Sequence, residues 1–206
     1  MLYTTELVTR TLPVSELFDK YCEPTRILPL CEACPDYGRV WSCPPDGPGT
    51  ALFRAFKTAV ILGVKLGYTE AALARALVSP EETEAVRVES YGFVKRQVIE
   101  TLLQLEKFFP PSHTIAAGRC ELCTRCTRLE GLPCRKPASL RYSFSALGFD
   151  LGRVSEELLN TPLLWASRGL PAYQMAIYAF LTDRMEAAEA ACENLRTAQE
   201  TWRREG

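Results

Sequence analysis

Residues Thr58–Leu66 read TAVILGVKL, a short, β-branched and almost wholly apolar run that predicts a buried strand. Downstream, residues Ser79–Glu82 read SPEE. This stretch has a capping serine, a proline at the first helical position and a glutamate three residues after the serine, so it predicts a helix start. The helix can run towards Phe109, and His113–Ala117 then predicts a second strand. A strand, a long helix and a strand predict a βαβ unit, with its parallel pair at the centre of a small sheet.

The rest of the chain extends this unit into a single α/β domain. Helices are expected at Pro13–Tyr21, Tyr68–Val78 and Leu151–Trp165, and a third strand at Ala172–Leu181. A C-terminal helix is expected from Asp183 to Glu205. We therefore expect residues 1–182 to form a cysteine-rich, metal-binding α/β domain with two cysteine-rich loops. The helix in 183–206 would pack on that domain or form a homodimer contact.

Charge and hydropathy exclude several classes of protein. The 206 residues include 24 basic and 25 acidic side chains, and a net charge of −1 disfavours nucleic-acid binding. The chain has no apolar run of about 18 residues, so no membrane span is expected. The opening sequence MLYTTELVTR does not resemble an export signal, so we expect a cytoplasmic protein.

Seven of the nine cysteines fall into two groups. The first has the spacing C-x2-C-x8-C and the second C-x2-C-x2-C-x7-C, and their members are Cys31, Cys34 and Cys43, and Cys120, Cys123, Cys126 and Cys134. Only Cys22 and Cys192 lie outside. Because a cytoplasmic location disfavours disulfides, this clustering indicates metal binding.

The second group has the triplet spacing with which bacterial ferredoxins hold three corners of a [4Fe-4S] cluster. A fourth cysteine, Cys134, follows after seven intervening residues. A single zinc ion is usually bound by two separated pairs of ligands, so the crowded triplet suits zinc less well. The spacing favours a cluster, and zinc is the alternative cofactor.

The second group also lies in a basic stretch. Between Gly118 and Arg141 there are six basic and only two acidic residues. Such surroundings favour the reduced, more negative form of a cluster. They could also receive a small anionic substrate or an acidic redox protein, so the loop at 118–141 is the expected partner surface.

The first group has only three clustered cysteines. A fourth ligand could be Cys22, an oxygen ligand such as Asp36, a residue of a partner or an exogenous molecule. A cluster held by three cysteines has one iron open to small-molecule or sulfur chemistry, whereas zinc with Cys22 would be structural. The only histidine, His113, lies near the second group in the chain.

Three segments resemble a family of cysteine-rich predicted metal-binding proteins of unknown function from anaerobic bacteria and archaea. They read CEACPDYGRVWSCPPDGP, GRCELCTRC…LPCRKP and LRYSFSALGFDL, and the resemblance runs from about Cys31 to Leu181. It implies that the seven grouped cysteines are the metal-binding set. The chain departs from the family at Lys136, where a histidine is usual, and at Ser145, where a glutamate is usual.

Three functional hypotheses follow. The first is a redox-active iron–sulfur protein with one or two [4Fe-4S] clusters. As an enzyme it would catalyse a redox, sulfur-transfer or desulfuration reaction, with electrons passing from the second group to the first. The second is a non-enzymatic electron carrier or cluster-delivery module. The third is a structural zinc protein.

Overall fold

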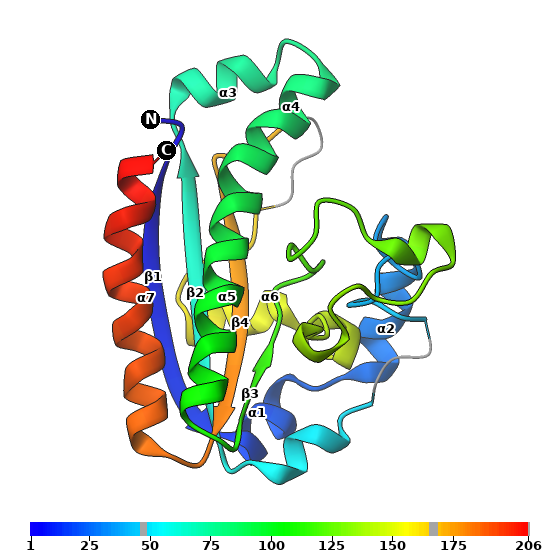
Figure 1. The fold of residues 1–206 in the computed structure, drawn as a ribbon, viewed down its shortest axis with the longest axis vertical. Helices are drawn as coiled ribbons and strands as arrows, with labels where there is room; N and C mark the ends of the chain where they lie inside the picture. The colour runs from blue at the N-terminus through cyan, green and yellow to red at the C-terminus, as the bar shows by residue number, and fades with distance from the viewer. Residues whose placement is uncertain (46–48, 165–168, 206) are drawn as a thin grey trace.

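A four-stranded antiparallel sheet in the order β1-β2-β4-β3 forms the centre of the protein (Figure 1). The computed structural model describes residues 1–45, 49–164 and 169–205, with side chains up to Trp202. The strands are β1 (Tyr3–Pro13), β2 (Thr58–Tyr68), β3 (Ser112–Ile115) and β4 (Tyr173–Thr182). The prediction of a single mixed α/β domain is confirmed, with β2, β3 and β4 close to the expected positions.

The predicted parallel centre is wrong. β4 lies between β2 and β3 and pairs with both in antiparallel register, so the βαβ unit is split by a strand from the end of the domain. Every residue of β4 from Met175 to Thr182 is buried, as is typical of a central strand covered on both faces. β3 is only four residues long and forms the edge.

Two elements near the N-terminus were not predicted. β1 pairs with β2 along eleven residues. It is an edge strand, and its sequence mixes Thr, Glu and Arg with apolar residues, so it has no continuous apolar run that would predict a strand. Helix α2 (Pro24–Glu32) contains Pro29, a residue that normally argues against a helix.

The predicted helices are present with shorter bounds. Ser79 caps α4 as expected, its side chain accepting the N–H of Glu82 at 3.2 Å. A π-helical turn (Val88–Gly92) joins α4 to α5. Another (Val154–Leu158) ends the helix that was predicted to reach Trp165, a residue outside the described ones. The bounds are α1 Val14–Tyr21, α3 Glu70–Ala76, α4 Pro80–Arg87, α5 Phe93–Phe108, α6 Leu151–Arg153 and α7 Met185–Glu205. None of the described helices is long and apolar enough to cross a membrane.

The sheet separates two hydrophobic cores. Alternate residues of β2 face opposite sides, so Val60 and Leu62 pack with α5 and α7, whereas Ala59 and Ile61 pack with α1 and a group of phenylalanines. Figure 1 shows α5 and α7 on the same side of the sheet, with α7 against β1. The C-terminal helix is thus part of the core of the domain, and a contact with a second copy stays a prediction.

Truncation of Leu102 to alanine should lower the free energy of unfolding by about 2–5 kcal/mol, because this α5 side chain is completely buried. Leu77→Ala is the matched control. Leu77 is 76% exposed, so its truncation should cost no more than about 0.5 kcal/mol. Urea unfolding followed by circular dichroism measures both, and equal losses would contradict the assignment of the core.

Candidate metal centre

The second cysteine group lies in the long irregular loop that follows β3 at the edge of the sheet (Figure 1). Gly118 begins this loop with a φ of 59°, which residues with a Cβ rarely adopt. The loop encloses a cavity whose lining residues are Cys120, Cys123, Cys126, Cys134, Trp41, Thr127, Arg135 and Leu140. The structure therefore brings all four cysteines of this group around one space.

Cationic side chains hold the backbone of this loop by donating hydrogen bonds to its carbonyl oxygens. Two of these cations come from helix α5 and two from the loop itself. The bonds are Lys95 Nζ to Arg119 (3.0 Å), Arg96 Nε to Glu121 (2.8 Å), Lys136 Nζ to Leu122 (2.9 Å) and Arg135 Nη1 to Arg125 (3.0 Å). Much of the positive charge around the loop is thus used to position its backbone.

The direction of these carbonyls affects the sulfur atoms. In a trans peptide the C=O of one residue and the N–H of the next point in opposite directions. When a cation binds the carbonyl oxygen from one side of the loop, the next N–H therefore points to the opposite side. Arg96 holds the carbonyl of Glu121, and the next N–H, that of Leu122, donates to the sulfur of Cys120. Burial raises the pKa of the Cys120 thiol, and this hydrogen bond opposes the rise. Hydrogen bonds to sulfur are one of the factors that set cluster potentials.

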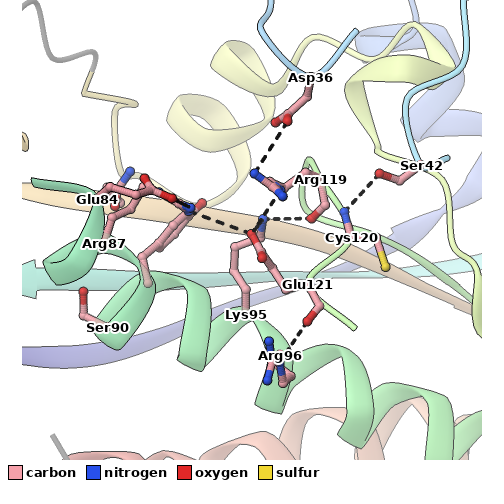
Figure 2. A network of polar contacts seen from close by, with 12 residues as sticks. Asp36, Ser42, Glu84, Arg87, Ser90, Lys95, Arg96, Arg119, Cys120 and Glu121 are labelled. Carbon is pink, nitrogen blue, oxygen red and sulfur yellow. Dashed lines mark hydrogen bonds and ion pairs between the residues drawn. The ribbon is translucent and has the colours of Figure 1, made fainter. Parts of the chain in front are cut away.

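A chain of charges connects α5 to both cysteine loops (Figure 2). Lys95 is only 5% exposed, and its Nζ lies 3.3 Å from Oε1 of Glu121. Burial lowers the pKa of Lys95, and the Glu121 carboxylate opposes that change. Arg119 lies 3.9 Å from the carboxylates of both Glu121 and Asp36, and Asp36 belongs to the first loop. Electrostatics therefore help to dock the first loop on the second.

The first cysteine group lies at the end of α2 and in the turns that follow. The N–H of Cys34 donates to the carbonyl of Cys31 (2.9 Å), and Gly38, with a φ of 67°, donates to the carbonyl of Cys43 (2.9 Å). Burial is the main cause of the raised pKa values of Cys31 and Cys43, and the charge of Cys34 contributes to both. Cys34 therefore acts electrostatically on both other thiols of the group.

Serine residues surround the first group. Burial raises the pKa of Cys43 to about 11, although hydrogen bonds from the Ser42 and Ser143 hydroxyls lower it. The sulfur of Cys31 lies 3.8 Å from the carbonyl oxygen of Ser145. The hydroxyls of Ser143 and Ser145 are 3.1 Å apart, so they form one polar wall.

The structure places both positions that were expected to depart from the family pattern at these loops. Lys136 uses its ammonium group to hold the carbonyl of Leu122 beside the second group. Ser145 lies beside Cys31, and a glutamate in its place would bring a carboxylate near the first group. The atom of Ser145 that lies near the Cys31 sulfur is its backbone carbonyl oxygen.

Cys22 lies between α1 and α2, outside the turns that carry Cys34 and Cys43. Cys31 is itself in α2, and the helix rises about 10 Å from its first residue, Pro24, to Cys31 at 1.5 Å per residue. Cys22 instead forms an isolated β-bridge with Phe149 and packs against the second core. A role as the fourth ligand stays a prediction for Cys22, as it does for Asp36 in the loop of the first group.

The two loops are packed directly on each other. Trp41 of the first loop lines the cavity of the second group, and its indole N–H donates to the carbonyl of Leu132 (3.2 Å). The guanidinium of Arg128 lies 4.6 Å from the Trp41 ring centre and donates from Nε to the carbonyl of Gly38 (2.8 Å). The cysteines lining this cavity all belong to the second group, and Trp41 is the residue of the first loop that reaches it.

The remaining candidates lie elsewhere. His113 is on β3, where burial is the main cause of its lowered pKa and where Arg141 and Glu106 also act on it. Cys192 packs on α7 against the first core. Within the described residues, no group of three or more His, Cys, Asp and Glu side chains is arranged to hold a metal ion as it stands. The role of the seven cysteines as ligands thus stays a prediction.

Several supporting residues were not predicted. Lys95 and Arg96 lie within a helix whose pattern indicates only core packing, and nothing in the sequence distinguishes them from solvent-exposed cations. The sequence did contain a signal for Ser42, because this residue lies within the W-S-C-P-P segment next to Cys43.

Comparison with known proteins supports a metal-related family. A family model described as "Predicted metal-binding protein (DUF2284)" matches residues 20–181, a range that includes both cysteine groups. No curated protein and no solved structure matches the chain.

The reduced, metal-free protein should lose stability as the pH rises from about 9 to about 11. The ordinary pKa of the thiol is 9.0 and that of folded Cys43 is about 11, so the native state holds this proton more tightly than the unfolded chain does. This contribution, of order 2 kcal/mol, is complete below pH 9 and is lost as the pH rises through 11. Urea midpoints measured across this pH range provide the test. Cys43→Ala should flatten the decline and Cys192→Ala should not, and identical profiles would contradict the prediction.

Proposed function

The chain belongs to the DUF2284 family of predicted metal-binding proteins, and we propose that it is a redox-active iron–sulfur protein. Its second cysteine group holds one [4Fe-4S] cluster, and Cys31, Cys34 and Cys43 hold a second centre with an open position. One observation carries this proposal. A loop with ferredoxin-type spacing lines a single cavity with all four of its cysteines, and a backbone N–H donates to one of the sulfurs.

The surroundings of the second group support a cluster rather than zinc. Trp41 and Leu140 contribute apolar walls that keep water away, and water exclusion tunes cluster potentials. Lys95 and Arg96 bring positive charge to the loop by binding its backbone carbonyls, which leaves the cysteine sulfurs available as ligands. A bound cluster would supply one-electron chemistry at this position.

The two sites would have different roles. With four cysteines, the second site is closed and suits electron transfer. With three cysteines, the first site would leave one coordination position to a non-protein ligand, next to the hydroxyls of Ser143 and Ser145. The reaction class we propose is reduction of a small molecule, or gain or loss of sulfur by it, at the first site.

An acidic redox protein is the proposed electron donor. Arg125, Arg135 and Lys136 are exposed on the second loop, so they can attract a negatively charged surface. A reducing cytoplasm is the proposed location, since all nine cysteines are free thiols.

Protein purified without oxygen should be brown and contain about eight irons and eight sulfides per chain for two cubanes, or about four of each for one. Absorbance spectra with iron, sulfide and zinc analysis of the same sample provide the measurement. Colourless protein with one or two zinc ions would overturn the redox proposal.

Cysteine variants should show how much of the absorbance and iron belongs to each cysteine group. Cys123→Ser should remove the cluster of the second group, whereas Cys192→Ser, the matched control, should remove nothing. Cys22→Ser should also leave both centres, because Cys22 packs against the second core and is not in the proposed ligand set. Iron loss in Cys22→Ser without unfolding would contradict the proposed ligand set.

Reversal of charge on the second loop should slow electron delivery. In Arg125→Glu/Arg135→Glu, reduction by an acidic flavodoxin should be about tenfold slower at low ionic strength, with a smaller difference at high salt. Stopped-flow bleaching of the cluster measures the rate. Arg184→Glu, which changes a partly exposed arginine next to α7, is the control. Equal rates in all three proteins would exclude this surface as the docking site.

A further inference from the structure

Ser42 lies between the two cysteine groups and contacts both. Its side chain is fully buried, and its Oγ accepts a hydrogen bond from the N–H of Cys120 at 3.0 Å (Figure 2). The same Oγ lies 3.8 Å from the sulfur of Cys43, the next residue in the chain. Its carbonyl oxygen accepts the N–H of Ser143 at 2.9 Å, which fixes the backbone at this point.

A serine hydroxyl has one proton and can both accept and donate. Because Oγ already accepts the N–H of Cys120, its proton is free to be donated to the sulfur of Cys43. Donation from Ser42 also opposes the rise that burial causes in the pKa of Cys43. The result is a continuous chain of hydrogen bonds from the backbone of one group to a sulfur of the other.

We propose that Ser42 couples the two sites, so that metal binding at either one favours metal binding at the other. This inference rests on the proposed function only in taking both cysteine groups as metal sites. Metal binding converts the Cys43 thiol into a thiolate, which is a stronger acceptor for the Ser42 hydroxyl. Donation to a thiolate makes Oγ a better acceptor for the N–H of Cys120, because hydrogen bonds in a chain polarise one another. The Cys120 segment is then held more firmly, and the effect must be reciprocal.

Ser143 provides a matched control. Its hydroxyl also donates to Cys43, and it is equally buried, with 1% of its surface exposed. The contacts of its side chain in the described structure are with the first group and Ser145, not with Cys120. Loss of this hydroxyl should weaken the first site without affecting communication between the sites.

The test uses cobalt(II) titration of the full, reduced, metal-free chain, followed by thiolate-to-cobalt absorbance. Coupling is the ratio of cobalt affinity at the first site in the intact chain to that in Cys123→Ser/Cys126→Ser, which lacks a complete second site. We expect Ser42→Ala to reduce this ratio about fivefold or more. Ser143→Ala should lower the affinity of the first site about tenfold and leave the ratio unchanged. Equal ratios in Ser42→Ala and Ser143→Ala would overturn the inference.

A second measurement does not depend on the folding of Ser42→Ala. When zinc is added to the Cys123→Ser/Cys126→Ser chain, the amide resonance of Cys120 should shift as the first site fills. The same shift should occur when Ser143→Ala is added to that chain. An unchanged Cys120 amide at saturating zinc would overturn the inference.

The inference and the proposed function can fail separately. If the native protein lacks iron and sulfide but shows cobalt coupling through Ser42, the iron–sulfur proposal fails and the coupling stands. If clusters are present but Ser42→Ala leaves the ratio of cobalt affinities unchanged, only the coupling inference fails. Cobalt binding at neither cysteine group would overturn both.

Discussion

The polar backbone of the second cysteine loop has few partners of its own, and the cations that satisfy it determine the geometry of the site. Lys95 and Arg96 extend from one turn of α5 to two carbonyls of the loop, while Glu121 returns a carboxylate to Lys95. An unpaired buried carbonyl or ammonium is costly, so the loop and helix stabilise each other. Because α5 is fixed on the sheet by side chains such as Leu102, the position of the cysteines depends on the core of the domain.

The first loop completes this arrangement with three consecutive residues that have different roles. The ring of Trp41 closes the cavity of the second group, the hydroxyl of Ser42 lies between the groups, and the thiol of Cys43 belongs to the first. From Cys120 to Cys43 the connection crosses one hydrogen bond, and its other links are covalent. Two centres joined in this way would exchange electrons inside the protein without a mobile carrier, consistent with a donor site beside a reacting site.

Local signals in the sequence predicted individual helices and strands, but not which strands lie next to each other in the sheet. The apolar runs of β2 and β4 and the capped start of α4 predicted those elements, and cysteine spacing predicted which thiols belong together. The order of the strands could not be predicted from local signals, because the insertion of β4 between β2 and β3 depends on contacts across more than a hundred residues of chain. The cations near the second group were expected to attract anions, yet Arg135 and Lys136 also hold the loop backbone. Helix α2, which carries Cys31, was missed because it contains a proline, and the fourth ligand of the first group stays a prediction.

The position of β4 has a consequence for biosynthesis. The second cysteine loop leaves the sheet from β3, and β3 pairs with β4, the last strand to be made. Until residues 173–182 have emerged from the ribosome, β3 has no strand to pair with, and the loop lacks its anchor on the sheet. A cofactor delivered before that moment would meet cysteines that are not yet held in place. Insertion of a metal would therefore follow the emergence of β4, on a chain whose sheet has closed.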